Sequence, residues 1–111
     1  MGSAVSLSNF ELMVMLAIIR IGEDAYGVSI SNEIESRTGG AVLLGSVYDA
    51  LGRLEEKGLI TSSLGEATAE RGGRAKRHFR ATSAGLRLVR ETQRSLVKLW
   101  KGLPQLSGGE V

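Results

Sequence analysis

The chain has 111 residues, a length typical of a single domain, and its 42% hydrophobic and 23% charged residues are ordinary for a globular protein. It contains no cysteine, which excludes disulfide bonds, thiolate chemistry and cysteine-ligated zinc. The net charge of +2 hides an asymmetry, because residues 1–70 carry 4 basic and 10 acidic side chains whereas residues 71–111 carry 10 basic and 2 acidic ones. Such sorting predicts a positive surface that binds an anionic partner, with a merely solvated basic helix face as the alternative.

Neither the N-terminus nor the apolar runs have the pattern of a signal peptide or of a transmembrane helix. No basic region followed by an apolar run and a cleavage site opens the chain, so a signal peptide is not expected. The longest apolar run, Leu12–Ile19, has 8 residues and is too short to cross a bilayer. We therefore expect a cytoplasmic protein without a membrane partner.

Two helices are predicted in the first part of the chain. Residues 10–21 are apolar on nearly every side, with Ser8 or Asn9 as the N-cap. A helix of this kind requires burial all round, so we expect one face in the domain core and the rest against a partner chain. After a turn at 22–24, a narrow apolar stripe with four-residue spacing predicts a second helix that ends near Thr38, before two glycines.

A third helix and a β-hairpin are predicted next. Four apolar residues at helical spacing predict a helix over Ser46–Lys57, capped at Gly45 or Ser46. Residues 59–64 have the composition of a strand, and residues 76–81 are expected to return as its partner. The pair would form a hairpin with a tip about ten residues long.

A long final helix is predicted after Thr82, which caps it. Its apolar positions repeat at spacings of 3, 4, 3, 4 and 3 residues, which is a heptad seam with one polar member, Gln93. Pro104 ends the helix, and residues 105–111 are expected to fray. The predicted fold is therefore mainly α with a small β-hairpin, in the order helix, helix, helix, hairpin, helix.

This order is the layout of a winged helix-turn-helix. We expect residues 1–82 to form a DNA-binding domain and residues 83–104 to form a C-terminal dimerisation helix. In helix-turn-helix docking, the second helix of the motif lies in the major groove with its N-terminal residues nearest the bases. Here that helix offers Ser46 and Tyr48 to phosphates or base edges, and Arg53 to a phosphate.

Cations gather on the predicted hairpin. They are Arg71, Arg74, Lys76, Arg77 and Arg80. Two glycines among them allow close approach to a sugar-phosphate wall, and each neutralised phosphate releases counterions, so we expect this hairpin to supply affinity for duplex DNA. The alternative is a flexible, soluble loop. His78, on the same strand, is interpreted as a hairpin residue because no second ligand lies at metal spacing; no metal and no cofactor are expected.

Three stretches of the chain together resemble one known family. They are Tyr26-Gly27, the run GSVYDALGRLEEKGLI over residues 45–60, and the run GGRAKRHFRATSAG over residues 72–85. This ordered set is similar to the PadR family of bacterial transcriptional regulators, over roughly residues 10–100. The resemblance implies a homodimer that binds an inverted-repeat operator, usually as a repressor, and is joined by a single C-terminal helix.

The resemblance also implies roles for individual residues. The DNA-binding residues of the family correspond here to Ser46, Tyr48, Arg74, Lys76 and Arg77. The chain departs from the family at Asp49, where proline is common, and at Gly52, where a basic residue is common. Asp49 would repel a phosphate, and Gly52 removes a contact and weakens the helix by up to ~1 kcal/mol relative to alanine. Both departures leave the operator sequence open.

The predicted dimer interface lies on the first and last helices. Its residues are Leu12, Met15, Ile19, Leu86, Val89, Gln93, Leu96, Trp100 and Leu103. Trp100 is interpreted as an aromatic residue of the dimer core. The alternative is that Trp100 and its mate line a central pocket for planar, drug-like effectors, as some PadR-like proteins do.

The sequence thus predicts a sequence-specific DNA-binding transcriptional regulator. An enzyme is not expected, because no nucleophile–base arrangement and no phosphate-binding loop after a strand is present. Two alternatives stay open: a small-molecule sensor with a pocket near Trp100, and a winged-helix module that binds an acidic partner protein. The salt dependence of binding to duplex DNA separates the last alternative from the first prediction.

Overall fold

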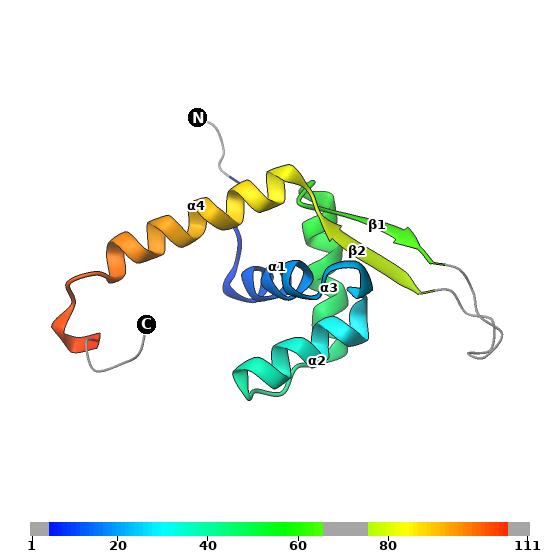
Figure 1. The fold of residues 1–111 in the computed structure, drawn as a ribbon, viewed down its shortest axis with the longest axis horizontal. Coiled ribbons are helices and arrows are strands. Elements are labelled where there is room, and N and C mark those ends of the chain that lie inside the picture. The colour runs from blue at the N-terminus through cyan, green and yellow to red at the C-terminus, as the bar shows by residue number, and fades with distance from the viewer. Residues whose placement is uncertain (1–4, 66–75, 107–111) are drawn as a thin grey trace.

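The computed structural model describes residues 5–65 and 76–106 and confirms the predicted order of elements (Figure 1). The elements are the helices α1 (Asn9–Ile21), α2 (Gly27–Thr38), α3 (Leu44–Glu56) and α4 (Ser83–Trp100), the strands β1 (Ile60–Leu64) and β2 (Arg77–Ala81), and two short 3-10 helices, η1 (Gly22–Asp24) and η3 (Pro104–Leu106). The fold is mainly α with a two-stranded antiparallel hairpin, as the sequence predicted.

Helix α1 begins where the sequence predicted, because two of its residues cap each other. The Ser8 hydroxyl accepts from the Glu11 amide at 3.1 Å, and the Glu11 carboxylate accepts from the Ser8 amide at 2.9 Å. This reciprocal capping box satisfies two amides that have no partner inside the helix. The helix ends at Gly22, whose φ of 84° suits glycine and directs the chain out of the helix.

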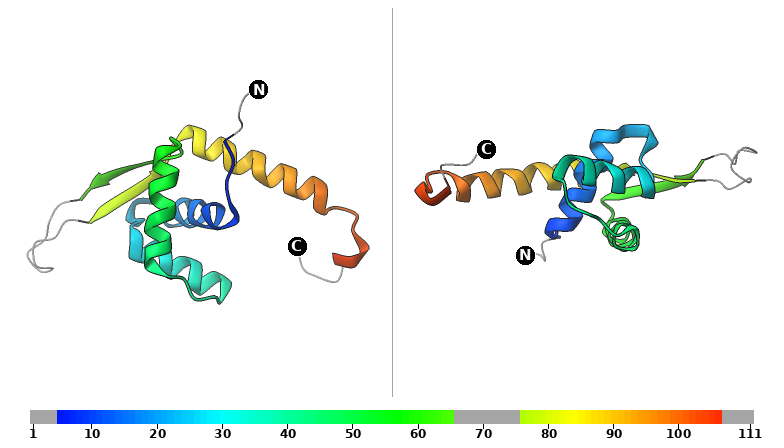
Figure 2. Two further views of the ribbon diagram at one scale, coloured as in Figure 1. Left: turned by 180° about the vertical axis from the view of Figure 1, so that it is seen from behind. Right: turned by 90° about the horizontal axis from the view of Figure 1, so that it is seen from below.

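Helices α1, α2 and α3 share one apolar core, onto which the hairpin packs (Figure 2). Its largest fully buried side chains are Met15, Ile18, Ile30, Leu51, Leu54, Ile60, Val14 and Val47. Met15 is 0% exposed, so its predicted place in a dimer interface is wrong. A helix that is apolar on all sides does not show by its sequence which face the domain itself covers, and Met15 lies on that face.

Helix α3 begins two residues earlier than predicted. Its N-cap is Leu43, whose side chain makes no capping hydrogen bond, so a cap at Gly45 or Ser46 is incorrect. The entry to the helix is fixed by a tertiary contact instead, because the Val42 amide donates to the Glu35 carboxylate of α2 at 2.8 Å. Ser46 consequently lies inside the first turn of the helix rather than in front of it.

The hairpin is joined to the loop before α2. Strands β1 and β2 pair from Ile60 opposite Ala81 to Leu64 opposite Arg77. On the other edge of β2, the Phe79 amide donates to the Ala25 carbonyl at 2.8 Å, and Tyr26 forms an isolated antiparallel bridge with His78. No local sequence pattern indicated this third segment, which fixes the middle of β2 to the start of α2.

Helix α4 is anchored at its start and then leaves the core. The Thr82 hydroxyl accepts from the Gly85 amide at 3.0 Å, which confirms the predicted cap. Gly85 lies so close to Leu59 that a Cβ atom would collide with its carbonyl oxygen. The rest of α4 projects away on the side opposite the hairpin (Figure 1, Figure 2).

The end of α4 differs from the prediction. The helix stops at Trp100, since the backbone of Lys101 is extended and Gly102 follows with a φ of 78°, so Leu103 lies beyond the helix. Of the expected frayed tail, residues 105 and 106 belong to η3 instead, and residues 107–111 lie outside the described part of the chain.

Candidate nucleic-acid interface

The first turn of α3 presents two polar side chains to solvent. One face of this helix is buried against the core through Val47, Ala50, Leu51 and Leu54. The opposite face leaves Ser46 and Tyr48 exposed, and Tyr48 keeps 50% of its surface accessible. Both predicted DNA contacts of this turn are therefore free to meet a partner outside the domain.

The position of Tyr48 depends on Gly27. A Cβ atom at Gly27 would overlap the ring and hydroxyl of Tyr48, so the tyrosine lies directly against the backbone at the start of α2. This contact accounts for Gly27 in the Tyr26-Gly27 motif, because any larger residue would push the tyrosine aside. The sequence showed Gly27 only as part of this motif, and the structure identifies Tyr48 as the side chain that it admits.

Arg53 has a partner inside the protein. Its Nε donates to the Glu11 carboxylate at 2.8 Å, while about half of its side chain stays exposed. Lys57 donates to the same carboxylate at 2.8 Å. The phosphate contact predicted for Arg53 stays a prediction, because the ion pair occupies its Nε while about half of the side chain is exposed.

The carboxylate that binds them is deeply buried. Glu11 is 2% exposed, and burial by itself raises the pKa of its carboxyl. Hydrogen bonds from Lys57, from the Ser8 amide and from Arg53 more than offset this effect and lower the pKa to about 2. The sequence does not reveal this role of Glu11, because its cationic partners lie more than forty residues away along the chain.

Two cations at the start of β2, Lys76 just before the strand and Arg77 as its first residue, contact neighbouring side chains. The Lys76 ammonium lies 4.2 Å from the centre of the Tyr26 ring, and the His78 ring packs edge-on to the same tyrosine at 5.7 Å. Arg77 is exposed and donates to the Ser62 hydroxyl at 3.0 Å. Tyr26 thus packs against Lys76 and His78 at the start of β2.

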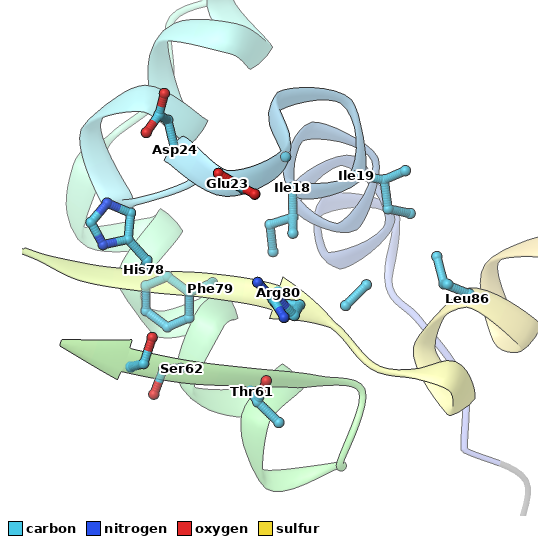
Figure 3. Close-up of a pocket in the computed structure, with 13 residues that line it drawn as sticks. Ile18, Ile19, Glu23, Asp24, Thr61, Ser62, His78, Phe79, Arg80 and Leu86 are labelled. Carbon is cyan, nitrogen blue, oxygen red and sulfur yellow. The ribbon is translucent and has the colours of Figure 1, made fainter. Parts of the chain in front are cut away.

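The outer face of the hairpin forms an open groove of about 720 Å³ against η1 and the start of α4. Figure 3 shows His78, Phe79 and Arg80 along β2, with Glu23 and Asp24 of η1 beside them. Arg80 is exposed here, whereas Arg71 and Arg74 lie outside the described residues. The groove combines the carboxylates of Glu23 and Asp24 with the cation Arg80, so it has no single charge.

Half of the basic residues after position 70 lie on or next to α4 rather than on the hairpin. They are Arg87, Arg90, Arg94, Lys98 and Lys101, and all are exposed. Their spacing of 3, 4, 4 and 3 residues places them along one side of the helix. Among the residues that the structure describes, none of them forms an ion pair. The positive charge predicted for the C-terminal part is thus divided between two ends of the molecule.

A second, apolar groove of about 940 Å³ lies between α1 and the end of α4. It is lined by six residues of the predicted dimer interface, Leu12, Val89, Gln93, Leu96, Trp100 and Leu103. Ile19 and Leu86, the other two exposed members of that set, line the groove beside the hairpin instead. Sequence reasoning missed Leu16 and Val97, which also line the apolar groove and are 48% and 42% exposed.

Other kinds of site find no support in the described ranges 5–65 and 76–106. No three histidine, cysteine, aspartate or glutamate side chains gather there in a way that could hold a metal ion. Within the same ranges, no helix combines the length and apolar character needed to span a membrane.

Comparisons with known proteins agree with this geometry. Residues 15–91 match the transcriptional regulator PadR-like family, and no curated protein matches the chain. A PadR family transcriptional regulator from Eggerthella lenta has a similar structure, with a TM-score of 0.68 and 26% identity over 88% of this chain and 83% of its own. A PadR-like regulator from Bacillus cereus has a TM-score of 0.71 and 24% identity over 91% of this chain and 93% of its own. A PadR family regulator from Clostridium difficile has a TM-score of 0.70 and 20% identity over 88% of this chain and 98% of its own.

The family match covers more than half of the chain, and the related structures share its helices and its hairpin. The exposed first turn of α3 and the basic β2 strand lie within the matched residues. The chain therefore belongs to the PadR-like family of transcriptional regulators.

Proposed function

We propose that the chain is a homodimeric repressor that binds an inverted-repeat DNA site through α3 and through the wing, meaning the hairpin β1–β2 and the residues between its strands. The observation that carries this proposal is the exposed turn of α3 with Ser46 and Tyr48, next to a strand whose exposed side chains are basic. A helix of this kind fits the major groove with its N-terminal residues toward the bases. The wing supplies phosphate contacts.

A dimer is supported by the apolar groove between α1 and α4. Leu16, Leu96 and Trp100 line this groove and are each more than 40% exposed, and exposed apolar side chains gathered in one groove mark a surface that a partner covers. A second copy fits it because the heptad seam of α4 contributes to the same groove, and self-complementary seams form two-fold dimers. Two-fold symmetry in turn requires an inverted repeat in the DNA.

Selection of bound sites from random duplex DNA at stated salt tests this function. We expect a palindrome with half-sites about one helical turn apart, and an affinity that falls steeply as salt rises. Retention of DNA without any sequence preference would contradict a specific regulator. A flat salt dependence would favour the protein-interaction module instead. A reporter placed behind the selected site should lose expression when the protein is present, and increased expression would contradict repression.

The dimer is tested by two leucines of one helix. Leu96→Asp places a charge in the apolar groove and should give a monomer in sedimentation experiments, because a buried unpaired charge is strongly unfavourable. Leu99→Asp makes the same change at a position that is 75% exposed and outside the groove, so it should remain a dimer. Equal sedimentation of both variants as dimers would refute this interface.

A second candidate function is the binding of planar molecules at the dimer groove. Trp100 lines the groove and keeps 49% of its surface exposed, which leaves an aromatic face for stacking. Binding should quench the fluorescence of Trp100, the single tryptophan of the chain. Unchanged fluorescence across a broad panel of planar compounds would count against an effector site.

A further inference from the structure

A buried carboxylate ties the proposed DNA-contacting helix to α1. The Glu11 side chain is 3% exposed, and its two oxygens accept from Lys57 Nζ and from Arg53 Nε, both at 2.8 Å. The Ser8 amide donates to one of these oxygens as well. Both oxygens of the buried charge are therefore satisfied by charge-assisted hydrogen bonds, which are strong and directional.

The hydrogen bonds to Glu11 restrict sliding and rotation of α3, which apolar packing alone does not. Apolar contacts are non-directional, so they decide which face of a helix is buried and tolerate small slides and rotations. Arg53 and Lys57 lie about one helical turn apart, and two directional bonds from this end of the helix to one carboxylate restrict both motions. On the other side of α3, the Ser62 hydroxyl donates to Glu55 at 2.8 Å and links the helix to β1.

The same carboxylate also removes positive charge from the recognition surface. Helix α3 contains one basic and three acidic residues, and its basic residue is the Arg53 that Glu11 neutralises. Lys57 directly follows the helix and is neutralised as well. Nonspecific attraction to phosphate is thereby left to the wing, and α3 presents the uncharged Ser46 and Tyr48 beside the acidic Asp49.

We propose that Glu11 is a positioning residue for operator recognition, which holds α3 at the orientation that an inverted repeat requires and keeps Arg53 and Lys57 from phosphate contacts. The inference rests on the proposed function. Helix α1 suits this role because it also reaches the proposed dimer interface: Leu12, next to Glu11, lines the groove for the partner. Glu11 thus connects the dimer surface with the recognition helix, whose spacing from its mate must match the half-sites.

Glu11→Gln is compared with Glu33→Gln, which makes the same charge change elsewhere. Glu33 also pairs with two arginines, at 2.7 Å with Arg37 and 3.8 Å with Arg20. Binding is measured on the selected palindrome and on a random duplex of equal length across a salt series, and folding is followed by circular dichroism. For Glu11→Gln we expect the ratio of the two affinities to fall about tenfold. The salt slope on random DNA should steepen by up to about 1.8 per protomer, because two cations are released. Glu33→Gln should change neither quantity.

Arg53→Gln provides a second test that keeps Glu11 paired with Lys57. If Arg53 is a positioning residue, preference for the palindrome falls, while affinity and salt slope on random DNA stay unchanged. A lower affinity for random DNA, with a slope flatter by about 0.9, would show a direct phosphate contact and overturn the proposal. An unchanged preference in both folded variants would also overturn it. A wild-type protein that selects no sequence would overturn the proposed function itself, which is a distinct result.

Discussion

Helix α3 and the wing differ in how they are charged and how they are held. The exposed side of α3 carries no free cation near Ser46 and Tyr48, only the acidic Asp49, and the end of the helix is held by ionic hydrogen bonds. Strand β2 has two arginines and one histidine among its five residues and no carboxylate. The strand is held by ring contacts around Tyr26 and by a backbone hydrogen bond from Phe79 to Ala25.

This difference indicates a division of labour in DNA binding. Cationic contacts with phosphates supply affinity that depends on salt and not on sequence, which suits the wing. Discrimination between bases requires polar side chains at fixed positions, which suits a helix that its own protein holds rigidly. Helix α4 carries as much positive charge as the wing, but at the opposite end of the molecule, and it therefore offers a control for charge alone.

The largest effect is expected from the wing. Replacement of Arg74, Lys76 and Arg77 by glutamine should lower affinity for every duplex by about a thousandfold at physiological salt, since three phosphate contacts are lost in each of two protomers. The slope of log affinity against log salt should become shallower by about 0.9 for each lost contact. Fluorescence anisotropy on labelled duplexes over a salt series measures both quantities.

The matched change is made on α4. Substitution of Arg87, Arg90 and Arg94 by glutamine alters the net charge equally, and we expect a much smaller change in affinity and slope. Intact binding and salt dependence in the wing variant would disprove the wing model. Equal losses in the two variants would show that net charge, rather than the wing, determines affinity.

An intermediate effect is expected on folding stability, which should depend on pH through the Glu11 carboxylate that holds α3. The folded pKa of Glu11, about 2, is lower than its ordinary value of 4.5, so ionised Glu11 stabilises the fold. This contribution of about 3 kcal/mol is fully present above pH 4.5 and is lost as the pH falls toward 2. Urea unfolding from pH 6 to pH 2 should therefore show a smaller loss of stability for Glu11→Gln than for the wild type. Parallel curves for the two proteins would contradict this role for the carboxylate.

The smallest effect is expected from alanine substitutions at two glycines, Gly27, which contacts Tyr48 of α3, and Gly52, which lies within α3. Gly27→Ala should displace the Tyr48 ring and weaken binding to the selected palindrome about tenfold, or about 1.4 kcal/mol. Gly52→Ala adds a methyl group where nothing lies within 4 Å, so it should leave affinity unchanged and raise helix stability by up to about 1 kcal/mol. Equal affinity of the two variants for the palindrome would show that the position of Tyr48 does not matter for recognition.

Local signals in the sequence were sufficient to predict the order of the helices and the hairpin, and two of the caps. Ser8 and Thr82 cap α1 and α4 because the amides that they satisfy lie three residues away. The exposure of Ser46 and Tyr48 followed from helical spacing alone, since the four buried residues of α3 occupy the opposite face. These features depend on neighbours within one or two turns, which the sequence shows directly.

Tertiary structure decided the remaining features, because their causes lie far apart in the chain. Arg53 is paired because Glu11, 42 residues earlier, is buried beside it, and no spacing rule connects the two. Met15 belongs to the core rather than to a partner, because the fold selects which face of an all-apolar helix it covers. The sequence by itself thus determined the elements and their exposed chemistry. The packing of distant segments decided which charges remain free for DNA, since only the folded chain brings Glu11 to the end of α3.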